Sequence, residues 1–233
     1  MLYFDPTYIL VIIGFALSVF ASFGVKATFE KYRGVRNARG FTGERAARMI
    51  LDANGLQHIR IERVQGELTD HYSPNEGVIR LSGSTYDSES VGAIGVAAHE
   101  CGHAVQHKAG YVPIKIRNGI VPFVNICNGA SMPLFIIGMI LGVRTSFGYS
   151  LAMLGVLLFS AVLLFQIITL PTEINASRRA LNTIKSMGLL EGSDYEGAKK
   201  VLTAAAMTYV AAVASTALQL LRLFILANRN KRD

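Results

Sequence analysis

The sequence predicts a mainly α-helical membrane protein that crosses the bilayer several times and carries one small α+β domain. Of its 233 residues, 51% are hydrophobic and only 17% are charged, which is more apolar than an ordinary soluble domain. The apolar residues are gathered in four stretches, each close to the roughly 20 residues that a helix needs to cross the hydrocarbon core. A polar segment, residues 26–118, separates the first two stretches and is large enough to fold, but too small to form a large core alone.

The first apolar stretch, within residues 1–25, is expected to be an N-terminal transmembrane anchor. It carries no charge from Tyr8 to Val25, and the preceding MLYFDPT contains no basic residue. A signal peptide normally begins with a basic region, so an anchor that is not cleaved is favoured.

Residues 119–170 are expected to form a transmembrane hairpin whose two arms are joined by the short turn RTSFG. Pro122 and Pro133 predict a kink in the first arm, where the freed backbone groups need partners inside the protein. Pro171 is expected to end the second arm, because proline cannot donate a helical hydrogen bond.

The last segment, residues 201–233, comprises a fourth apolar helix over 201–227 and a basic tail. The small residues of AAAMTYVAAVAS allow close helix packing in a membrane. Arg222 lies inside the apolar stretch, and three basic residues follow it: Arg229, Lys231 and Arg232. Two interpretations therefore stay open: either this helix crosses the bilayer, or it lies along the interface and only three segments cross.

The distribution of basic residues predicts the orientation. Residues 26–118 contain 13 of the 23 lysines and arginines and residues 171–200 contain 5, whereas the hairpin turn has only Arg144. Both polar segments are therefore expected to be cytoplasmic in a multi-pass protein of the cell membrane. Four spans would leave both termini outside, which conflicts with the basic tail. The net charge of +7 is explained by this bias and by attraction to anionic lipid, and no basic patch predicts nucleic-acid binding.

The polar segment 26–118 begins with helix and strand signals. Thr42 is placed to cap a helix over residues 43–54, which Gly55 would end. In HIRIERV, Ile59 and Ile61 alternate with polar neighbours, and VIRLS at 78–82 is predicted as the partner strand after the turn SPNEG.

A second helix of this segment is predicted from Asp87 or Ser88 to Gly110, and it carries the motif HECGH. Histidines four residues apart share one helix face roughly 6 Å apart, so His99 and His103 can bind one cation. Glu100 lies about 100° round the helix from His99, beside the metal. This pattern is typical of a zinc site with a built-in general base.

Two further residues of this helix are not expected to bind the same zinc. His107 shares the face of His103 but lies about 12 Å along the axis from His99, so a supporting or structural role is expected. Cys101 points to the opposite side of the helix. Neither Cys101 nor Cys127 has a disulfide partner that the sequence context suggests.

A third ligand must come from elsewhere, and catalytic zinc often uses two histidines and a glutamate. Glu173 in LPTEINASRRAL is the best candidate, because it shares one face with Ala176, Ala180 and Ile184 on a helix predicted within residues 171–200. The alternative is an acid that simply stabilises the first helical turn.

The motifs HECGHAVQH, LPTEINASRRAL, TYVAA and DHYSPNEGVIRLS resemble the YugP-type neutral zinc metallopeptidases, membrane gluzincins related to CAAX prenyl proteases. The resemblance covers nearly the whole chain. It implies a zincin-like cytoplasmic part within 26–118, one Zn²⁺ per chain bound by His99, His103 and Glu173, and Glu100 as the catalytic acid and base. Asn175 departs from the family pattern, which usually has aspartate there, and its role is open.

The resemblance also implies an endopeptidase that hydrolyses membrane-associated or unfolded proteins. Arg178 and Tyr209 are the favoured stabilisers of the oxyanion, because each lies in one of the motifs; Arg179 and His107 remain candidates. A substrate peptide is expected to add along the edge of the strand VIRLS, unless this strand belongs to an ordinary small sheet. Lone His58 and His71 are expected at the surface or in packing roles.

Two other classes of function are kept open. A non-catalytic membrane scaffold would use zinc as a structural tie, which requires four protein ligands. A metal transporter needs polar residues along a path through the bilayer, and the arm before Pro171 offers few, with Ser160 and Gln166 near its middle. The expected partners are peptide or protein substrates and the lipid bilayer, with no nucleic acid; a homo-oligomer is left open.

Overall fold

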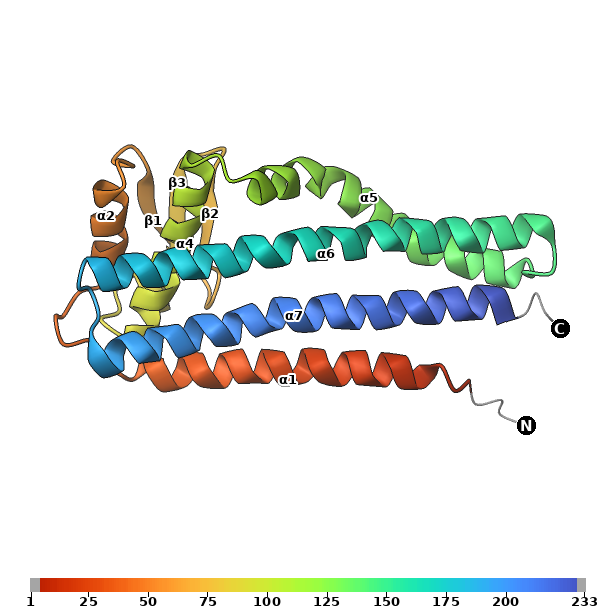
Figure 1. Cartoon of the computed structure of the whole chain (residues 1–233), viewed down its shortest axis with the longest axis horizontal. Helices are drawn as coiled ribbons and strands as arrows, with labels where there is room; N and C mark the ends of the chain where they lie inside the picture. The colour runs from red at the N-terminus through yellow and green to blue at the C-terminus, as the bar shows by residue number, and fades with distance from the viewer. Residues whose placement is uncertain (1–4, 230–233) are drawn as a thin grey trace. The chain divides into compact units, whose positions relative to one another are not determined.

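The computed structural model describes residues 5–229. The chain is mostly helical with one small sheet, which confirms the mainly α prediction (Figure 1). It divides into two compact units, an apolar unit of residues 1–21, 116–170 and 208–233 and a polar unit of residues 22–115 and 171–207. The elements in chain order are α1 (Tyr8–Arg33), α2 (Gly43–Ala53), β1 (Arg60–Val64), β2 (His71–Ser73), β3 (Val78–Ser82), α3 (Gly83–Tyr86), α4 (Val91–Lys108), α5 (Val112–Ile140), α6 (Ser146–Ser186) and α7 (Gly192–Arg229).

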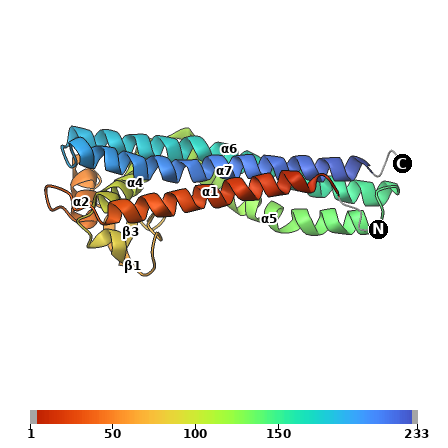
Figure 2. The same cartoon turned by 90° about the horizontal axis from the view of Figure 1, so that it is seen from below.

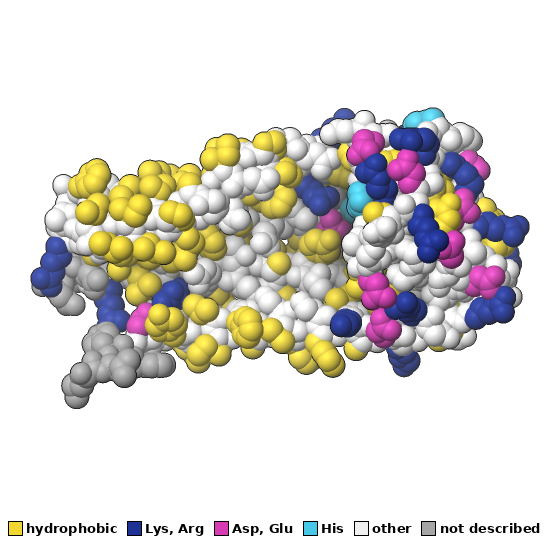
Figure 3. All heavy atoms as spheres, turned by 180° about the vertical axis from the view of Figure 1, so that it is seen from behind, with side chains coloured by type: hydrophobic (Ala, Val, Ile, Leu, Met, Phe, Trp, Pro, Cys, Tyr) yellow, Lys and Arg dark blue, Asp and Glu magenta, His cyan; other side chains and the backbone are white. Residues whose placement is uncertain are grey.

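Four helices, α1, α5, α6 and α7, are long and apolar enough to cross a membrane. In the apolar unit, large hydrophobic side chains such as Phe20 and Ile126 are more than two-thirds exposed. Figure 3 shows hydrophobic side chains covering the helices of this unit, whereas charged side chains gather over the polar unit. The outward apolar surface is the pattern that lipid-facing helices require.

The prediction that Pro171 ends a helix is wrong. Helix α6 continues through Pro171 to Ser186, and α5 likewise contains Pro122 and Pro133. A proline removes one helical hydrogen bond, but the turns that follow Pro171 bury Ala180 and Ile184 in the core of the polar unit. This burial outweighs the lost bond. The predicted kink is visible in α5, which bends along its length (Figure 1).

Small residues bring the helices of the apolar unit close together. Ser215 Oγ of α7 donates to the Gly14 carbonyl of α1 at 2.7 Å, and a Cβ at Gly14 would lie 3.2 Å from Ser215 Cα. The two helices run side by side in this unit (Figure 2). In the hairpin, Gly138 similarly leaves no room for a side chain, because a Cβ there would lie 2.4 Å from Ala152 N.

Arg222 has a local charge partner. Its Nη2 lies 3.7 Å from Asp5 Oδ2, its guanidinium lies 4.3 Å from the centroid of the Tyr8 ring, and Arg229 Nη1 lies 3.4 Å from Asp5 Oδ1. A cation in an apolar stretch is tolerated when an acid and an aromatic face neutralise it. The other basic residues of the predicted tail, Lys231 and Arg232, lie outside the described residues.

The polar unit is built around α4. Buried side chains from α2, the sheet, the end of α6 and the start of α7 pack against α4 residues such as Ile94, Ala98 and Cys101. Thr42 caps α2 as predicted, its Oγ1 accepting from Arg45 N at 3.2 Å, and Gly55 follows the helix with φ of 65°.

Helix α4 begins at Val91, three or four residues later than predicted. Ser90 is its N-cap and accepts from Ala93 N at 3.1 Å. The preceding backbone is held outside the helix, because the Ser88 carbonyl accepts from Gly43 N and the Glu89 carbonyl accepts from Asn37 N. Gly110 follows the other end of α4 with φ of 66°, as predicted.

The sheet has the order β1-β3-β2. Strands β1 and β3 pair as predicted, but in parallel, because the short strand β2 intervenes in the chain and forms the antiparallel partner of β3. The expectation that VIRLS offers an edge to a substrate peptide is therefore wrong, since β3 is the central strand and has a partner on each side.

Candidate metal centre

The structure brings His99 and His103 of α4 together with Glu173 of α6. Nε2 of His99 lies 3.2 Å from Oε2 of Glu173, and Nε2 of His103 lies 3.4 Å from the same oxygen. The ligand atoms of these three side chains all lie within 4.8 Å of one another. The residues that meet here are 74 positions apart in the chain, counted from His99 to Glu173.

Gly102 permits this meeting of α4 and α6. A Cβ at Gly102 would lie 2.6 Å from the carbonyl oxygen of Ala176, closer than any side chain tolerates. The glycine inside HECGH therefore lets the backbone of α6 approach α4 directly. This approach brings Glu173, less than one turn before Ala176, up to the histidines.

Each histidine ring is held by a hydrogen bond at its other nitrogen. Nδ1 of His99 lies 3.1 Å from Ser177 Oγ, and Nδ1 of His103 lies 3.1 Å from Oε1 of the fully buried Gln106. Gln106 Nε2 donates to the Thr172 carbonyl at 2.8 Å, which leaves its oxygen to accept from His103. Nδ1 of His103 therefore carries a proton, which leaves Nε2 as the nitrogen that faces Glu173 and that can bind a metal.

Asn175 also belongs to this network. Its Oδ1 accepts from Gln106 Nε2 at 3.0 Å and from Arg179 Nε at 2.8 Å. The residue whose role the sequence left open thus fixes the amide that orients His103. Arg179, one of the predicted oxyanion candidates, is engaged by Asn175.

The charges of the centre favour an anionic carboxylate. Burial acts to raise the pKa of Glu173, but hydrogen bonds from His103 and His99 outweigh it and hold this pKa below its ordinary value. Burial acts to lower the pKa of His103, but its hydrogen bond to Glu173 and the charge of Glu100 raise this pKa above its ordinary value. A negative carboxylate oxygen thus faces two imidazole nitrogens.

The donor set fits a zinc ion. With metal–ligand bonds of 2.0–2.1 Å, neighbouring ligand atoms of a tetrahedral zinc lie about 3.3 Å apart. The two distances to Glu173 Oε2, 3.2 and 3.4 Å, match this separation. Two imidazoles and one carboxylate are ligands that zinc accepts.

Glu100 is buried, with 8% of its surface exposed. Within residues 5–229, its carboxylate forms no hydrogen bond or ion pair with another residue. Its charge contributes to the raised pKa of His103, so the two groups interact electrostatically. The Glu100 carboxylate lies on the same helix as the two histidines and forms no hydrogen bond with another described residue. It is therefore able to accept a proton.

The remaining predicted residues lie in different surroundings. His107 is exposed and its Nδ1 lies 3.4 Å from the Tyr72 hydroxyl of β2. Cys101 faces α2, with its Sγ 3.6 Å from the Ala47 carbonyl, and burial raises its pKa. Arg178 is exposed on α6 and lines a pocket of about 420 Å³ with Ser177 and Tyr195.

Three other predicted residues are not among the three side chains of the metal centre. His58 and His71 are exposed, as expected. Tyr209 lies on α7 in the apolar unit and is half-buried. The roles of Arg178 and Tyr209 at an oxyanion stay predictions.

Comparison with known proteins agrees with the centre. The profile of a family described as "Putative neutral zinc metallopeptidase" matches residues 7–228. The chain belongs to this family. It is 46% identical over 224 residues to the "Putative membrane protease YugP" of Bacillus subtilis (strain 168), covering 96% of this chain and 97% of that protein. No solved structure matches the chain.

The family resemblance predicted from the motifs is thereby confirmed, whereas the relation to CAAX prenyl proteases stays a prediction. Sequence reasoning missed Gln106 and Ser177. Their positions carried a weak signal, because Gln106 lies three residues after His103 and Ser177 four residues after Glu173, each within about one helical turn of a ligand.

Proposed function

We propose that this protein is a membrane-embedded zinc-dependent endopeptidase that hydrolyses peptide bonds of membrane-associated or unfolded proteins. The observation that supports it most is the pair of short distances, 3.2 and 3.4 Å, from the histidine Nε2 atoms to one oxygen of Glu173. The match of the family to residues 7–228 supports the same class of reaction.

One zinc ion per chain would be held by His99, His103 and Glu173. When bound, it supplies a water of lowered pKa and polarises the carbonyl of the scissile bond. Ser177 and Gln106 would keep the Nε2 atoms of the two rings directed at the ion, because the side-chain oxygen of each lies 3.1 Å from Nδ1 of one ring and fixes its orientation.

Glu100 acts as general base and then as general acid. Its carboxylate takes a proton from the attacking water and passes it to the leaving amine, which departs uncharged. Glu100 suits this role because it lies on α4 beside both histidines and is not used by another residue in the described part of the chain. Arg178 or Tyr209 stabilises the negative charge that forms on the carbonyl oxygen.

The proposed location is the cell membrane, with four spans and the polar unit in the cytoplasm. The four apolar helices and the name of the Bacillus relative support a membrane protein. The cytoplasmic side is proposed from the basic residues, since residues 26–118 and 171–200 together hold most of them.

The alternative is a non-catalytic scaffold with a structural zinc. A structural site is closed by four protein ligands, whereas the group formed by His, Cys, Asp and Glu side chains within residues 5–229 has three members. Three ligands favour the catalytic proposal, because one position stays open to water.

The substitution Glu100→Gln tests the proposal. We expect the purified full-length variant to retain one zinc per chain by elemental analysis and to lose cleavage of an unfolded protein such as casein, because the amide cannot accept the proton. Glu67→Gln, an exposed acid that pairs with Arg33, serves as the matched control and should cleave normally. A wild type that binds zinc and cleaves neither unfolded nor membrane proteins would contradict the enzyme proposal.

A further inference from the structure

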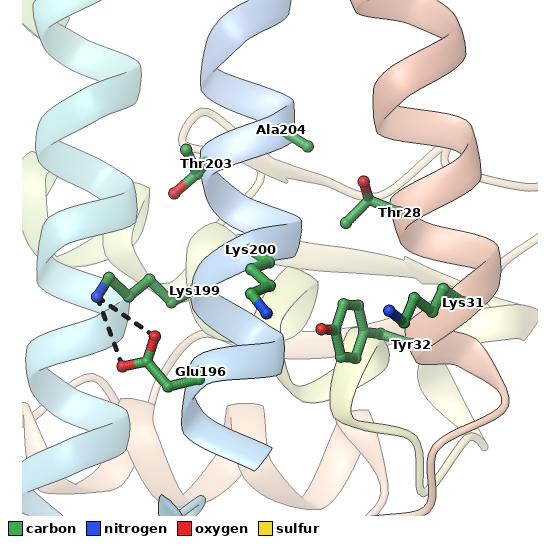
Figure 4. A pocket seen from close by; sticks show the side chains of 8 residues that line it. All are labelled: Thr28, Lys31, Tyr32, Glu196, Lys199, Lys200, Thr203 and Ala204. Carbon is green, nitrogen blue, oxygen red and sulfur yellow. Dashed lines mark hydrogen bonds and ion pairs between the residues drawn. The ribbon is translucent and has the colours of Figure 1, made fainter. Parts of the chain in front are cut away.

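A second pocket of the polar unit lies between the end of α1 and the start of α7 and has a volume of about 540 Å³ (Figure 4). It is separate from the metal centre, since it shares no residue with it. We call it the α1–α7 pocket. It is lined by Thr28, Lys31, Tyr32, Glu196, Lys199, Lys200, Thr203 and Ala204.

The aromatic ring of Tyr32 is fixed inside this pocket by a glycine. A Cβ at Gly197 of α7 would lie 2.7 Å from Cε1 of Tyr32, so the ring occupies the space that a side chain would fill. Figure 4 shows Tyr32 reaching from α1 toward α7, with its hydroxyl directed at the side of Lys200. The ring of Tyr32 therefore forms a fixed wall of the pocket, and its hydroxyl adds a polar group to that wall.

Two lysines of the α1–α7 pocket have no acidic partner within residues 5–229. Lys199 turns away and lies 3.4 Å from Glu196. Lys31 and Lys200 point from opposite helices into the space around Tyr32 (Figure 4), and neither forms an ion pair in the part of the chain that the structure describes. Two ammonium groups that face one space repel each other, and an anion between them would turn this repulsion into attraction.

The other polar groups suit a phosphate. Thr28 and Tyr32 each bring a hydroxyl to the pocket, and hydroxyls donate to phosphate oxygens as lysines do. Lysine binds phosphate as a point charge without strict geometry. The charges, hydroxyls and volume of the pocket suit a monoanionic phosphate that carries a substituent.

The surroundings favour a phosphate that belongs to a lipid. On the same face of α7 as Lys200, two turns further along the helix, Met207 is 51% exposed. Gly24 shares the face of Thr28, and a Cβ at Gly24 would meet nothing within 4 Å. The polar pocket is thus continued by an open apolar surface along which an acyl chain can lie, and a free phosphate would leave that surface unused.

We propose that the α1–α7 pocket binds an anionic phospholipid. Lys31 and Lys200 contact its phosphate, and the acyl chain lies along Gly24 and Met207. Basic pockets between apolar helices bind anionic headgroups by this combination of charge and apolar contact. This binding does not require the peptidase activity proposed above.

Native mass spectrometry of the full-length protein in detergent tests the lipid site. We expect phosphatidylglycerol to bind more tightly than phosphatidylcholine, and Lys31→Gln/Lys200→Gln to weaken phosphatidylglycerol binding about 25-fold, at roughly fivefold per lysine. The matched control, Lys26→Gln/Lys185→Gln, removes the same charge from exposed lysines outside the pocket. It should change the affinity by less than about twofold.

A second variant separates the lipid from a free phosphate. Gly24→Leu keeps both lysines and places a side chain in the open space, and leucine favours the helix more than glycine does. We expect this variant to bind phosphatidylglycerol less tightly while its helix content by circular dichroism is unchanged. Equal weakening in the two double variants would overturn the proposal in favour of diffuse charge attraction. Displacement of the lipid by glycerol phosphate at equal concentration would overturn the lipid as the occupant.

Discussion

At the scale of single residues, Gln106 connects the two parts of the metal centre. Its oxygen faces Nδ1 of His103 on its own helix, and its amide nitrogen donates to Thr172 and Asn175 on α6. A fully buried amide with all its groups paired cannot rotate without losing hydrogen bonds. The orientation of His103 therefore depends on a residue that is not itself a ligand.

The substitution Gln106→Leu is expected to weaken zinc binding by about 10- to 100-fold, the usual effect of losing a partner of a metal-binding histidine. Leucine removes the groups that pair with Nδ1 of His103 and with the Thr172 carbonyl. Competition with a chelator of known affinity measures the change. Gln57→Leu is the control, since Gln57 is exposed and donates to the Asp52 carbonyl, away from the centre. Equal zinc affinity in Gln106→Leu and wild type would contradict the role of the amide.

The predictability of single residues follows how rare their pattern is. His99, Glu100 and His103 were predictable because two imidazoles and an acid inside an apolar helix are costly to bury unless they bind a metal, and their spacing is that of a zinc site. Gln106, Ser177 and Asn175 are ordinary polar residues. Their roles depend on which atoms lie opposite in the fold, and their spacing of about one helical turn from a ligand gives only a weak signal in the sequence.

At the scale of elements, the contact of α4 with α6 determines whether the centre exists. Gly102 faces the Ala176 carbonyl so closely that the two helix backbones touch. Glu173 lies less than one turn from this contact point. If α6 moved away from α4 at this contact, the distances between Glu173 and the two histidines would therefore increase.

Gly102→Ala is therefore expected to destabilise the fold by about 1 to 3 kcal/mol, the usual cost of inserting a methyl group where there is no space, and to weaken zinc binding as well. The thermal unfolding midpoint and the zinc content measure the two effects. Gly129→Ala is the matched control, because Gly129 is also in a helix and a Cβ there would meet nothing within 4 Å. If both variants unfold at the wild-type temperature, the close approach is not a constraint.

Elements with local signals were predicted and elements with distant partners were not. Helix α2 was predicted through Thr42 and Gly55, because capping residues act on their own helix. Strand β2 has only three residues, too few to show an alternating pattern. Its pairing makes β1 and β3 parallel, and the continuation of α6 past Pro171 depends on a core whose members come from several segments of the chain.

At the scale of the whole molecule, an apolar hairpin lies in the sequence between the two histidines and Glu173. It leaves the polar unit after residue 115 and returns at residue 171, immediately before Glu173. The histidines alone could bind zinc only weakly, with two ligands. A complete three-ligand site can therefore form only after residues 116–170 have folded and residue 171 has returned to the polar unit.

The metal-free and zinc-bound proteins should respond to pH in opposite ways. Without zinc, the lowered pKa of Glu173 contributes stability above the ordinary pKa of about 4.5, and this contribution is lost as the pH falls through the lowered value. The raised pKa of His103 contributes stability below about pH 6.5, which is lost as the pH rises through the raised value. The ion pair of Glu173 and His103 thus stabilises the metal-free protein most between about pH 4.5 and about pH 6.5, where both contributions are complete.

Zinc reverses the upper limit, because it binds only neutral imidazole and must displace the proton of His103. We expect the rise in unfolding temperature on adding zinc to grow from about pH 5.5 to about pH 8, while the metal-free protein begins to lose the His103 contribution only above about pH 6.5. Thermal unfolding with zinc and with a chelator at each pH measures both curves. His71→Gln, which replaces an exposed histidine away from the centre, should leave them unchanged. A zinc effect of equal size at every pH would mean that the ion does not compete with a proton at His103, and the assignment of this side chain as a ligand would fail.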